Sequence, residues 1–514
     1  MSSPTPGAPT DDDADASPAS GTFGRKIGLV AAASAGALLV GELITLVQTV
    51  ALARLLSPSE VGLFVAGTVL TTFLTNFVEG GLRSGLVHRE DSIEDAAETV
   101  FRVTLLSGFA MSLGALALSP VIGMIFDNRT AGLVAAATSG SLLLFAFTNV
   151  PEAMLQRQFS VKRRVIVGPT VSLTFAVVAV AFAARGWGVW SMVIGSYASF
   201  VAWVLGVWLI CDWRPGRGTF SFRMWRELAR YGFPLLLGLV GARLKIMAES
   251  VIIGRGLSEA ALGQYRYAQR IAEIPERVII EVGAIALFPA FSRIAGDPER
   301  LRSAFLRALR FSMIGAVALT ALMLALGEPA VVIVFGEPWR EAGAAVVAMA
   351  GVGVGKAVAS VSEEAIKGAG RTTLINWCTA TELGLGLILL IALIGPFELI
   401  GVGLAVSITA ITVAILELSL AVSVIGVPFK ELLGAIAPPF PAAAVGFAVT
   451  LFLEHEVLHS DAHSLLIAVG MLVLDTLTFT VVYLLVFAVV APATVKQLFA
   501  VSGRLLRKLT GRAK

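Results

Sequence analysis

Long apolar segments recur along almost the whole chain and alternate with short polar stretches. Each segment has about 20 residues or more, the length that an α-helix needs to cross the hydrocarbon core of a bilayer. The sequence therefore predicts an all-α polytopic membrane protein with about 14 transmembrane helices. They are expected near residues 27–51, 61–82, 99–120, 131–152, 165–184, 187–210, 232–253, 262–290, 308–335, 342–366, 372–394, 399–425, 432–453 and 464–490.

Composition supports this class and excludes others. Hydrophobic residues make up 56% of the chain, the mean hydropathy is +0.84, and 15% of the residues are charged, against about 25% in ordinary soluble domains. The formal net charge of +3 is too small to indicate a nucleic-acid partner. The two cysteines, Cys211 and Cys378, fit no metal-binding spacing and are too few for a disulfide framework.

Basic residues fall mostly in one set of the expected loops, which the positive-inside rule makes cytoplasmic. The opposite, external loops hold Arg54, Arg129, Arg185, Arg255 and Arg340. Both termini are then cytoplasmic. Residues 1–24 are rich in Ser, Pro and Asp and are expected to form a disordered tail without the pattern of a cleaved signal peptide. A basic tail is expected at 493–514.

An internal repeat divides the chain. Arg54-Leu-Leu-Ser57 recurs at a shift of 201 as Arg255-Gly-Leu-Ser258, and the run PVIGMIF at 120–126 is echoed at a shift of 209 by PAVVIVF at 329–335. Two six-helix lobes in the same orientation are therefore expected, with a site between them. The predicted parts are an N-lobe at 25–211, a cytoplasmic linker at 212–231, a C-lobe at 232–425, and two extra helices within 426–492.

A charged stripe in the eighth predicted span is the first candidate site. Its members, Arg266, Arg270, Glu273, Arg277 and Glu281, are spaced by four, three, four and four residues, which places them within roughly 80° on one helical face. Charged side chains at membrane depth are costly unless they face a bundle interior or a water-filled cavity. The alternatives are a structural network between the lobes and an amphipathic helix lying on the membrane.

Several stretches resemble a known family. The runs ARLLSPSEVGLF (Ala53–Phe64), EGGLRSGLVHRED (Glu79–Asp91), YRYAQRIAEIP (Tyr265–Pro275) and LFPAFSR (Leu287–Arg293) are similar to those of polysaccharide-transport, Wzx-like flippases. These belong to the multidrug/oligosaccharidyl-lipid/polysaccharide exporter superfamily. The resemblance covers roughly residues 25–430, and the last two spans match only in being hydrophobic.

The resemblance implies a flippase of the bacterial cytoplasmic membrane. Its cargo would be a polyprenyl-diphosphate-linked oligosaccharide for exopolysaccharide, capsule or O-antigen synthesis, moved by alternating access between the two lobes. Other partners would be the lipid bilayer and the polymerase and other assembly proteins of the pathway. A lipid II flippase or an ion-coupled drug exporter of the same superfamily is the alternative. A membrane polymerase or ligase is disfavoured because every predicted external loop is short.

Arginine is suited to such cargo, because its forked and permanently charged donors match phosphate oxygens. The expected cationic cavity consists of Arg243, Lys245, Arg266, Arg270 and Arg277. Tyr265 and Tyr267 are expected either to flank the sugars or to anchor the helix at the membrane interface. Candidates for ion pairs or for coupling to an ion gradient are Glu42, Glu249, Glu273 and Glu281. Glu42 is the first choice for coupling because no basic residue lies near it in the sequence.

Weaker candidates complete the prediction. Glu382 and Glu417 are further intramembrane carboxylates, and Lys356 is expected to pair with Glu363 or Glu364. His455, His459 and His463 have helical spacing but lie in a short external loop, so no metal site is expected. The sequence contains no nucleophile triad, Walker loop, HExxH or dinucleotide fingerprint. We therefore expect neither an enzyme nor a cofactor.

Overall fold

The computed structural model describes residues 36, 40–158, 160, 163–275, 291–294 and 296–496, and these form helices joined by turns. Within this part of the chain, nine helices are long and apolar enough to cross a membrane, or ten if one bent pair is one span. The expected all-α polytopic class is confirmed. The count of fourteen stays a prediction, because the 27–51 and 262–290 segments lie partly outside the described residues and 372–425 is one long helical run.

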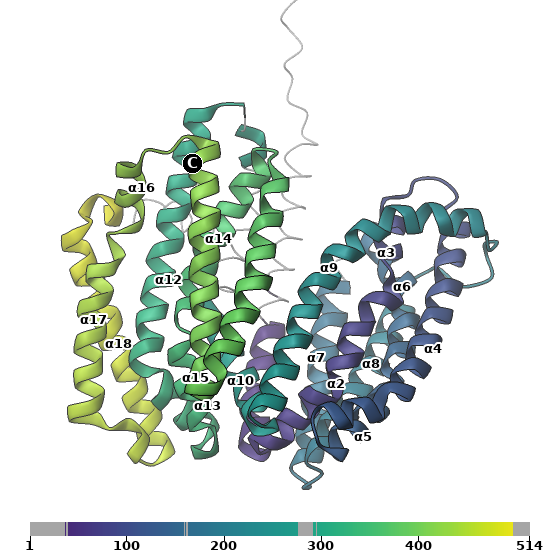
Figure 1. Cartoon of the computed structure of the whole chain (residues 1–514), viewed down its shortest axis with the longest axis horizontal. Coiled ribbons are helices and arrows are strands. Elements are labelled where there is room, and N and C mark those ends of the chain that lie inside the picture. Colours follow the sequence, from purple (N-terminus) through teal and green to yellow (C-terminus); the bar gives the residue numbers. More distant parts are fainter. Residues whose placement is uncertain are drawn as a thin grey trace, which may run out of the picture.

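The N-terminal bundle begins with helical residues 40–55 and continues to α8 (Figure 1). A π-helical turn, Arg163–Val167, precedes α7. The helices are α2 (Pro58–Glu79), α3 (Leu82–His88), α4 (Ile93–Ile125), α5 (Arg129–Thr138), α6 (Ser141–Arg157), α7 (Gly168–Ala183) and α8 (Val189–Ile210).

The remaining helices form the second bundle and the junction. They are α9 (Phe222–Gly256), α10 (Glu259–Ala272), α12 (Pro298–Phe335), α13 (Arg340–Ala348), α14 (Gly351–Gly368), α15 (Ile375–Ile425), α16 (Phe429–Ile436), α17 (Pro439–Leu453) and α18 (Leu465–Val490). Short helical turns lie at η2 (Glu337–Trp339), η3 (Thr372–Leu374), η4 (Glu454–Leu458) and η5 (Ser460–Ala462). Helix α15 is broken at Glu398, whose φ of 48° is not helical, between the two spans expected there.

Part of the expected linker is helical. Residues 212–221 connect the bundles, but from Phe222 onwards the chain already belongs to α9. Helix α9 packs against α2, α3 and α4 of the first bundle and against α10 and α15 of the second. It therefore joins the two lobes as a continuous helix, where sequence composition alone indicated a loop.

The repeated motifs occupy equivalent places in the two bundles. The hydroxyl of Ser57 caps α2 by accepting from the backbone N–H of Glu60, and that of Ser258 caps α10 by accepting from Ala261. Such hydroxyls satisfy N–H groups that the first turn of a helix leaves unpaired. The runs 120–126 and 329–335 end α4 and α12.

The two bundles meet at one end of the molecule and diverge toward the other (Figure 1). They meet where α10 packs against α2, at the end that the sequence predicts to be external. The opposite end carries α3 and α16 and the basic loops predicted to be cytoplasmic. Buried aromatic residues reinforce the junction: Tyr267 stacks on Trp339 with ring centroids 4.4 Å apart and the planes within 10°.

Candidate functional site

A cavity of about 590 Å³ lies between the bundles, inside the range typical of ligand pockets. Helices α2 and α8 form one wall, and α9 and α10 form the other. The lining residues are Val61, Phe64, Val65, Thr68, Val69, Thr72, Phe73, Met192, Arg243, Ile246, Met247, Arg266, Tyr267, Gln269, Arg270 and Glu273. We call it the central cavity.

The walls of the central cavity differ in charge. The α2 and α8 residues are apolar apart from Thr68 and Thr72. The α9 and α10 wall carries three arginines against one glutamate, so the described lining has an excess of positive charge. The structure thus brings Arg243, Arg266 and Arg270 to one cavity. Arg277 and Glu281, the other predicted members of the charged stripe, lie outside the described residues.

Within the part of the chain that the structure describes, two of these arginines make no direct contact with a carboxylate. Arg243 is exposed, and within the described part of the chain it has neither a hydrogen bond nor an ion pair. The Arg266 guanidinium donates to Oγ of Ser250 at 2.8 Å and to Oε1 of Gln269 at 3.0 Å, and it lies 5.9 Å from the ring centroid of Tyr265. Neutral partners orient Arg266 while its positive charge stays available to an anion.

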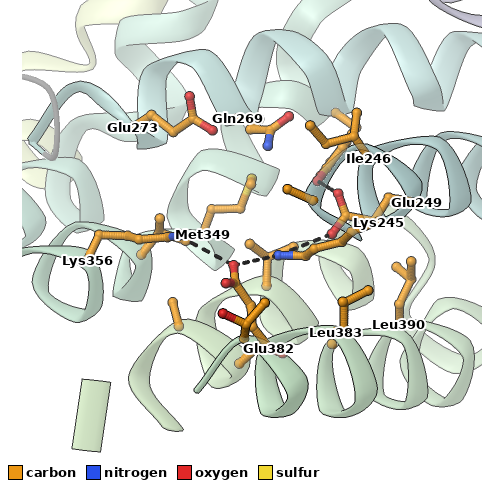
Figure 2. A pocket seen from close by; sticks show the side chains of 18 residues that line it. Lys245, Ile246, Glu249, Gln269, Glu273, Met349, Lys356, Glu382, Leu383 and Leu390 are labelled. Carbon is orange, nitrogen blue, oxygen red and sulfur yellow. Dashed lines mark hydrogen bonds and ion pairs between the residues drawn. The ribbon is translucent and has the colours of Figure 1, made fainter. Parts of the chain in front are cut away.

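Lys245 does not belong to the central cavity, contrary to the sequence-based prediction. It lies two residues after Arg243 on α9, and two helical residues are about 200° apart around the axis. Lys245 therefore points into a second pocket of about 530 Å³ within the C-lobe, lined from α9, α10, α14 and α15 and by Met349, which follows α13. We call it the C-lobe pocket (Figure 2).

A charge network crosses the C-lobe pocket. Nζ of Lys245 lies 2.7 Å from Oε1 of Glu382 and 3.7 Å from Oε1 of Glu249. Nζ of Lys356 lies 3.4 Å from the same oxygen of Glu382, so Glu382 bridges two ammonium groups (Figure 2). The hydroxyl of Tyr265 donates to Oε2 of Glu249 at 3.3 Å. Pairing is what makes charges tolerable at this depth.

Helix α10 separates the two cavities. Ile246, Gln269 and Glu273 line both of them. Tyr265 and Tyr267, two residues apart, lie on opposite sides of α10. Tyr265 is in the C-lobe pocket, and Tyr267 lines the central cavity with its ring stacked on Trp339. The two tyrosines therefore do not line the same cavity.

Other sequence-based candidates have different places. Glu42 lies in the helical stretch 40–55, is exposed, and lines neither cavity. Lys356 pairs with Glu382 rather than with Glu363 and Glu364, which both lie 2.9 Å from Lys367. The sequence identifies Glu382 as an intramembrane carboxylate, but it does not indicate that this side chain bridges two lysines. Thr68, Thr72 and Gln269 were missed, because uncharged polar residues give no comparable signal.

The histidines of the last predicted external loop do not form a metal site among the residues that the structure describes. His455 and His459 line a third pocket together with Glu328, Arg340 and Asp461. The Arg340 guanidinium lies 2.9 Å from both Glu328 and Asp461. This contact ties the loop between α17 and α18 to α12 and α13.

Comparison with known proteins gives a consistent result. The sequence pattern of the family described as "Polysaccharide biosynthesis protein" matches residues 51–344. The succinoglycan biosynthesis transport protein ExoT of Rhizobium meliloti is 25% identical over 57% of this chain, and the match spans 59% of ExoT. The teichuronic acid biosynthesis protein TuaB of Bacillus subtilis is 22% identical over 80% of this chain and 86% of TuaB.

Solved structures share the fold. The lipid II flippase MurJ in an inward closed conformation aligns with a TM-score of 0.70 over 91% of this chain and 99% of its own, at 15% identity. An inward-facing multidrug transporter of the MATE family aligns with a TM-score of 0.64 over 75% of this chain and 94% of its own, at 16% identity. The resemblance to this superfamily of exporters is thereby confirmed at the level of the fold.

Proposed function

The chain belongs to the polysaccharide biosynthesis protein family, and on that premise we propose that it flips a polyprenyl-diphosphate-linked oligosaccharide across the bacterial cytoplasmic membrane. The cargo would serve the assembly of a surface polysaccharide. The observation that carries this proposal is the central cavity between the lobes, with Arg243, Arg266 and Arg270 on one wall. The names of ExoT and TuaB, which refer to succinoglycan biosynthesis transport and to teichuronic acid biosynthesis, support it.

The chemistry of the cavity suits the three parts of such a cargo. A diphosphate needs fixed positive charge in a region of low dielectric, where Coulomb interactions are stronger than in water, and arginine supplies it with paired donors. Sugar hydroxyls find hydrogen-bonding partners in Thr68, Thr72 and Gln269. The polyprenyl chain stays in the surrounding lipid.

The finer architecture is part of the proposal. Fourteen spans, two six-helix lobes related as a parallel repeat, and cytoplasmic termini account for the helix order and for the equivalent caps at Ser57 and Ser258. The bundles diverge toward the predicted cytoplasmic end (Figure 1), which suits loading from that side. Alternating access then requires the bundles to part at the opposite end.

The C-lobe pocket is proposed to couple transport to an ion gradient. Glu249 is buried, interacts electrostatically with both Lys245 and Arg266, and thus connects the charge network to the central cavity. Glu273 lines both cavities. A change of protonation at Glu249 alters the electrostatic potential at Arg266. Because Arg266 lines the central cavity, this change would be felt by the bound cargo.

Charge reversal in the central cavity tests the function. Arg243→Glu is the sharpest variant, because Arg243 has no partner in the described structure whose loss would disturb folding. In cells that depend on this gene, we expect loss of surface polysaccharide with normal amounts of the protein in the membrane. Arg226→Glu is the matched control, since Arg226 is exposed on the same helix and, like Arg243, has neither a hydrogen bond nor an ion pair to another described residue. Normal export by Arg243→Glu and Arg266→Glu would refute a cationic cargo cavity.

Lipid II is a second candidate cargo, because the fold aligns with that of MurJ and lipid II also carries a polyprenyl diphosphate. Both cargoes present the same anion to the arginines. Rescue of cells depleted of their lipid II flippase would favour lipid II. Accumulation of a lipid-linked polysaccharide repeat unit in cells lacking this protein, without a cell-wall defect, would favour the first candidate.

A further inference from the structure

Two arginines outside both cavities connect the lobes at the end where the bundles meet. Nε of Arg54, in the first helical stretch, donates to the carbonyl oxygen of Val334 at 2.9 Å, and its Nη2 donates to that of Ile333. Nη1 of Arg255, at the end of α9, donates to the carbonyl oxygens of Ile125 at 2.9 Å and Met124 at 3.3 Å. Each arginine therefore crosses from its own lobe to the other.

These contacts are equivalent under the internal repeat. The two donors, Arg54 and Arg255, are corresponding positions of the repeat at a shift of 201 residues. The acceptors also correspond, at a shift of 209 residues: Met124 corresponds to Ile333, and Ile125 corresponds to Val334. The arginine of the N-lobe binds the end of α12 in the C-lobe, and the arginine of the C-lobe binds the end of α4 in the N-lobe. The arrangement is reciprocal down to the acceptor residues.

The acceptors suit an arginine. Carbonyl groups in the last turn of a helix lack intrahelical donors and carry the negative end of the helix dipole. A guanidinium fork can donate to two successive carbonyls and stays charged at all physiological pH values. Arg54 uses two nitrogens of its fork, whereas Arg255 donates to both carbonyls through Nη1 alone, so a lysine at position 54 would keep the charge but lose the fork.

Neighbouring contacts show that the lobes are closed here. Nε1 of the fully buried Trp339 donates to the carbonyl oxygen of Ala53 at 2.8 Å. Nδ2 of Asn128 donates to Oε1 of Glu259 at 2.9 Å. Both contacts also join the N-lobe to the C-lobe. Arg54 and Arg255 themselves are exposed at the rim, where water can replace their carbonyl partners, so release does not strand a buried charge.

We propose that Arg54 and Arg255 are a pair of reciprocal latches that hold this end of the transporter closed and that both release when the central cavity opens there. The proposal rests on the alternating access proposed above. It assigns to the repeated arginines a role in the conformational equilibrium and none in contacting cargo. Because the acceptors are backbone carbonyls, each latch depends on the arginine side chain alone.

A distance measurement across this end tests the latches. Spin labels on Asp127→Cys, beside the end of α4, and Glu337→Cys, beside the end of α12, are placed in a background with Cys211 and Cys378 replaced by alanine. Electron–electron double resonance of the full chain in lipid vesicles then reports the populations of closed and open states. The parent protein is expected to show mainly the short, closed distance.

Removing the latches should favour the open state. We expect Arg54→Ala and Arg255→Ala each to raise the ratio of open to closed populations severalfold, and the double variant to raise it by at least the product of the two factors. Arg129→Ala is the matched control, because Arg129 is exposed on the same side but no hydrogen bond or ion pair joins it to another described residue. An unchanged distance distribution in the double variant would overturn the proposal.

A conservative variant covers the case in which the double alanine variant does not accumulate. Arg54→Lys keeps the charge and should still raise the open fraction, because the fork with which Arg54 holds two carbonyls is lost. No shift in the folded lysine variant would likewise count against the latches. Failure of the cargo proposal is distinguishable from failure of this one. Normal polysaccharide export after charge reversal in the central cavity would refute the cargo proposal. The latch variants change no residue of that cavity, so their result tests the latches separately.

Discussion

Gly62 and Gly263 face one another where α2 crosses α10, so closely that a methyl group on Gly62 would lie 1.7 Å from the carbonyl oxygen of Glu259. A methyl group on Gly263 would lie 2.0 Å from the carbonyl oxygen of Pro58. The two glycines are related by the same shift of 201 as Arg54 and Arg255. They allow the helix N-termini of the two lobes to touch through their backbones.

Alanine at this crossing is expected to destabilise the closed junction. Gly62→Ala forces two backbones apart, and overpacking of this kind typically costs about 1–3 kcal/mol. The melting temperature of the purified protein should fall. Gly114→Ala is the control, because a methyl group there meets no atom within 4 Å and alanine favours the helix. A melting temperature unchanged by Gly62→Ala would show that the lobes do not pack this closely.

Lys245 and Glu382 should both be important for stability. Glu382→Leu leaves the ammonium groups of Lys245 and Lys356 without this carboxylate, and Lys245→Met leaves the carboxylates of Glu382 and Glu249 without this ammonium group. Removing one partner of a fully buried pair costs about 3–5 kcal/mol, and the partial exposure of the Lys245 and Glu382 side chains, 21% and 29%, reduces that figure. We expect Glu382→Leu and Lys245→Met each to lower the melting temperature.

An exposed ion pair supplies the control for that comparison. Arg300 and Asp297 lie 3.0 Å apart with side chains 78% and 45% exposed, and such pairs contribute about 0–1 kcal/mol. Arg300→Ala should leave the melting temperature almost unchanged. A melting temperature that neither Lys245→Met nor Glu382→Leu changes would contradict the charge network of the C-lobe pocket.

Ion coupling, if it acts through the C-lobe pocket, should be lost in Glu249→Gln. The amide retains the shape of the side chain but removes the charge that interacts with Lys245 and Arg266. In proteoliposomes loaded with a lipid-linked oligosaccharide, imposed proton or sodium gradients should no longer change the flux. Downhill movement of the cargo should continue.

Glu42→Gln is the comparison that separates the two coupling candidates. Glu42 lines neither cavity, so its variant should retain the response to the gradient. The opposite outcome, with Glu42→Gln insensitive and Glu249→Gln normal, would support the choice made from the sequence and exclude the C-lobe pocket as the coupling site.

Membrane orientation can be tested with a thiol reagent that does not cross the membrane. Cysteines at the exposed positions Arg129 and Arg185 should react in intact cells. Cysteines at the exposed positions Arg217 and Arg371 should react only after the cells are permeabilised, because the positive-inside rule places those loops in the cytoplasm. The reverse pattern would invert the orientation of the entire bundle and the direction of transport derived from it.

Sequence alone was sufficient for the helical membrane class, the family and the charged face of α10, because these depend on composition and on local helical periodicity. Arg266 and Arg270 are four residues apart and therefore share a face in any α-helix. The same periodicity places Arg243 and Lys245 of α9 on different faces of the helix, so the sequence already argues against placing both in one cavity.

Only the tertiary structure decided which helices face one another. Lys245 meets Glu382, which lies 137 residues away, and no local pattern relates the two positions. The repeat marked Arg54 and Arg255 as equivalent, but their partners are backbone carbonyls at the ends of α12 and α4. Every residue has such a carbonyl, so the acceptor carries no sequence signature, and the contact becomes visible only when packing brings the two lobes together.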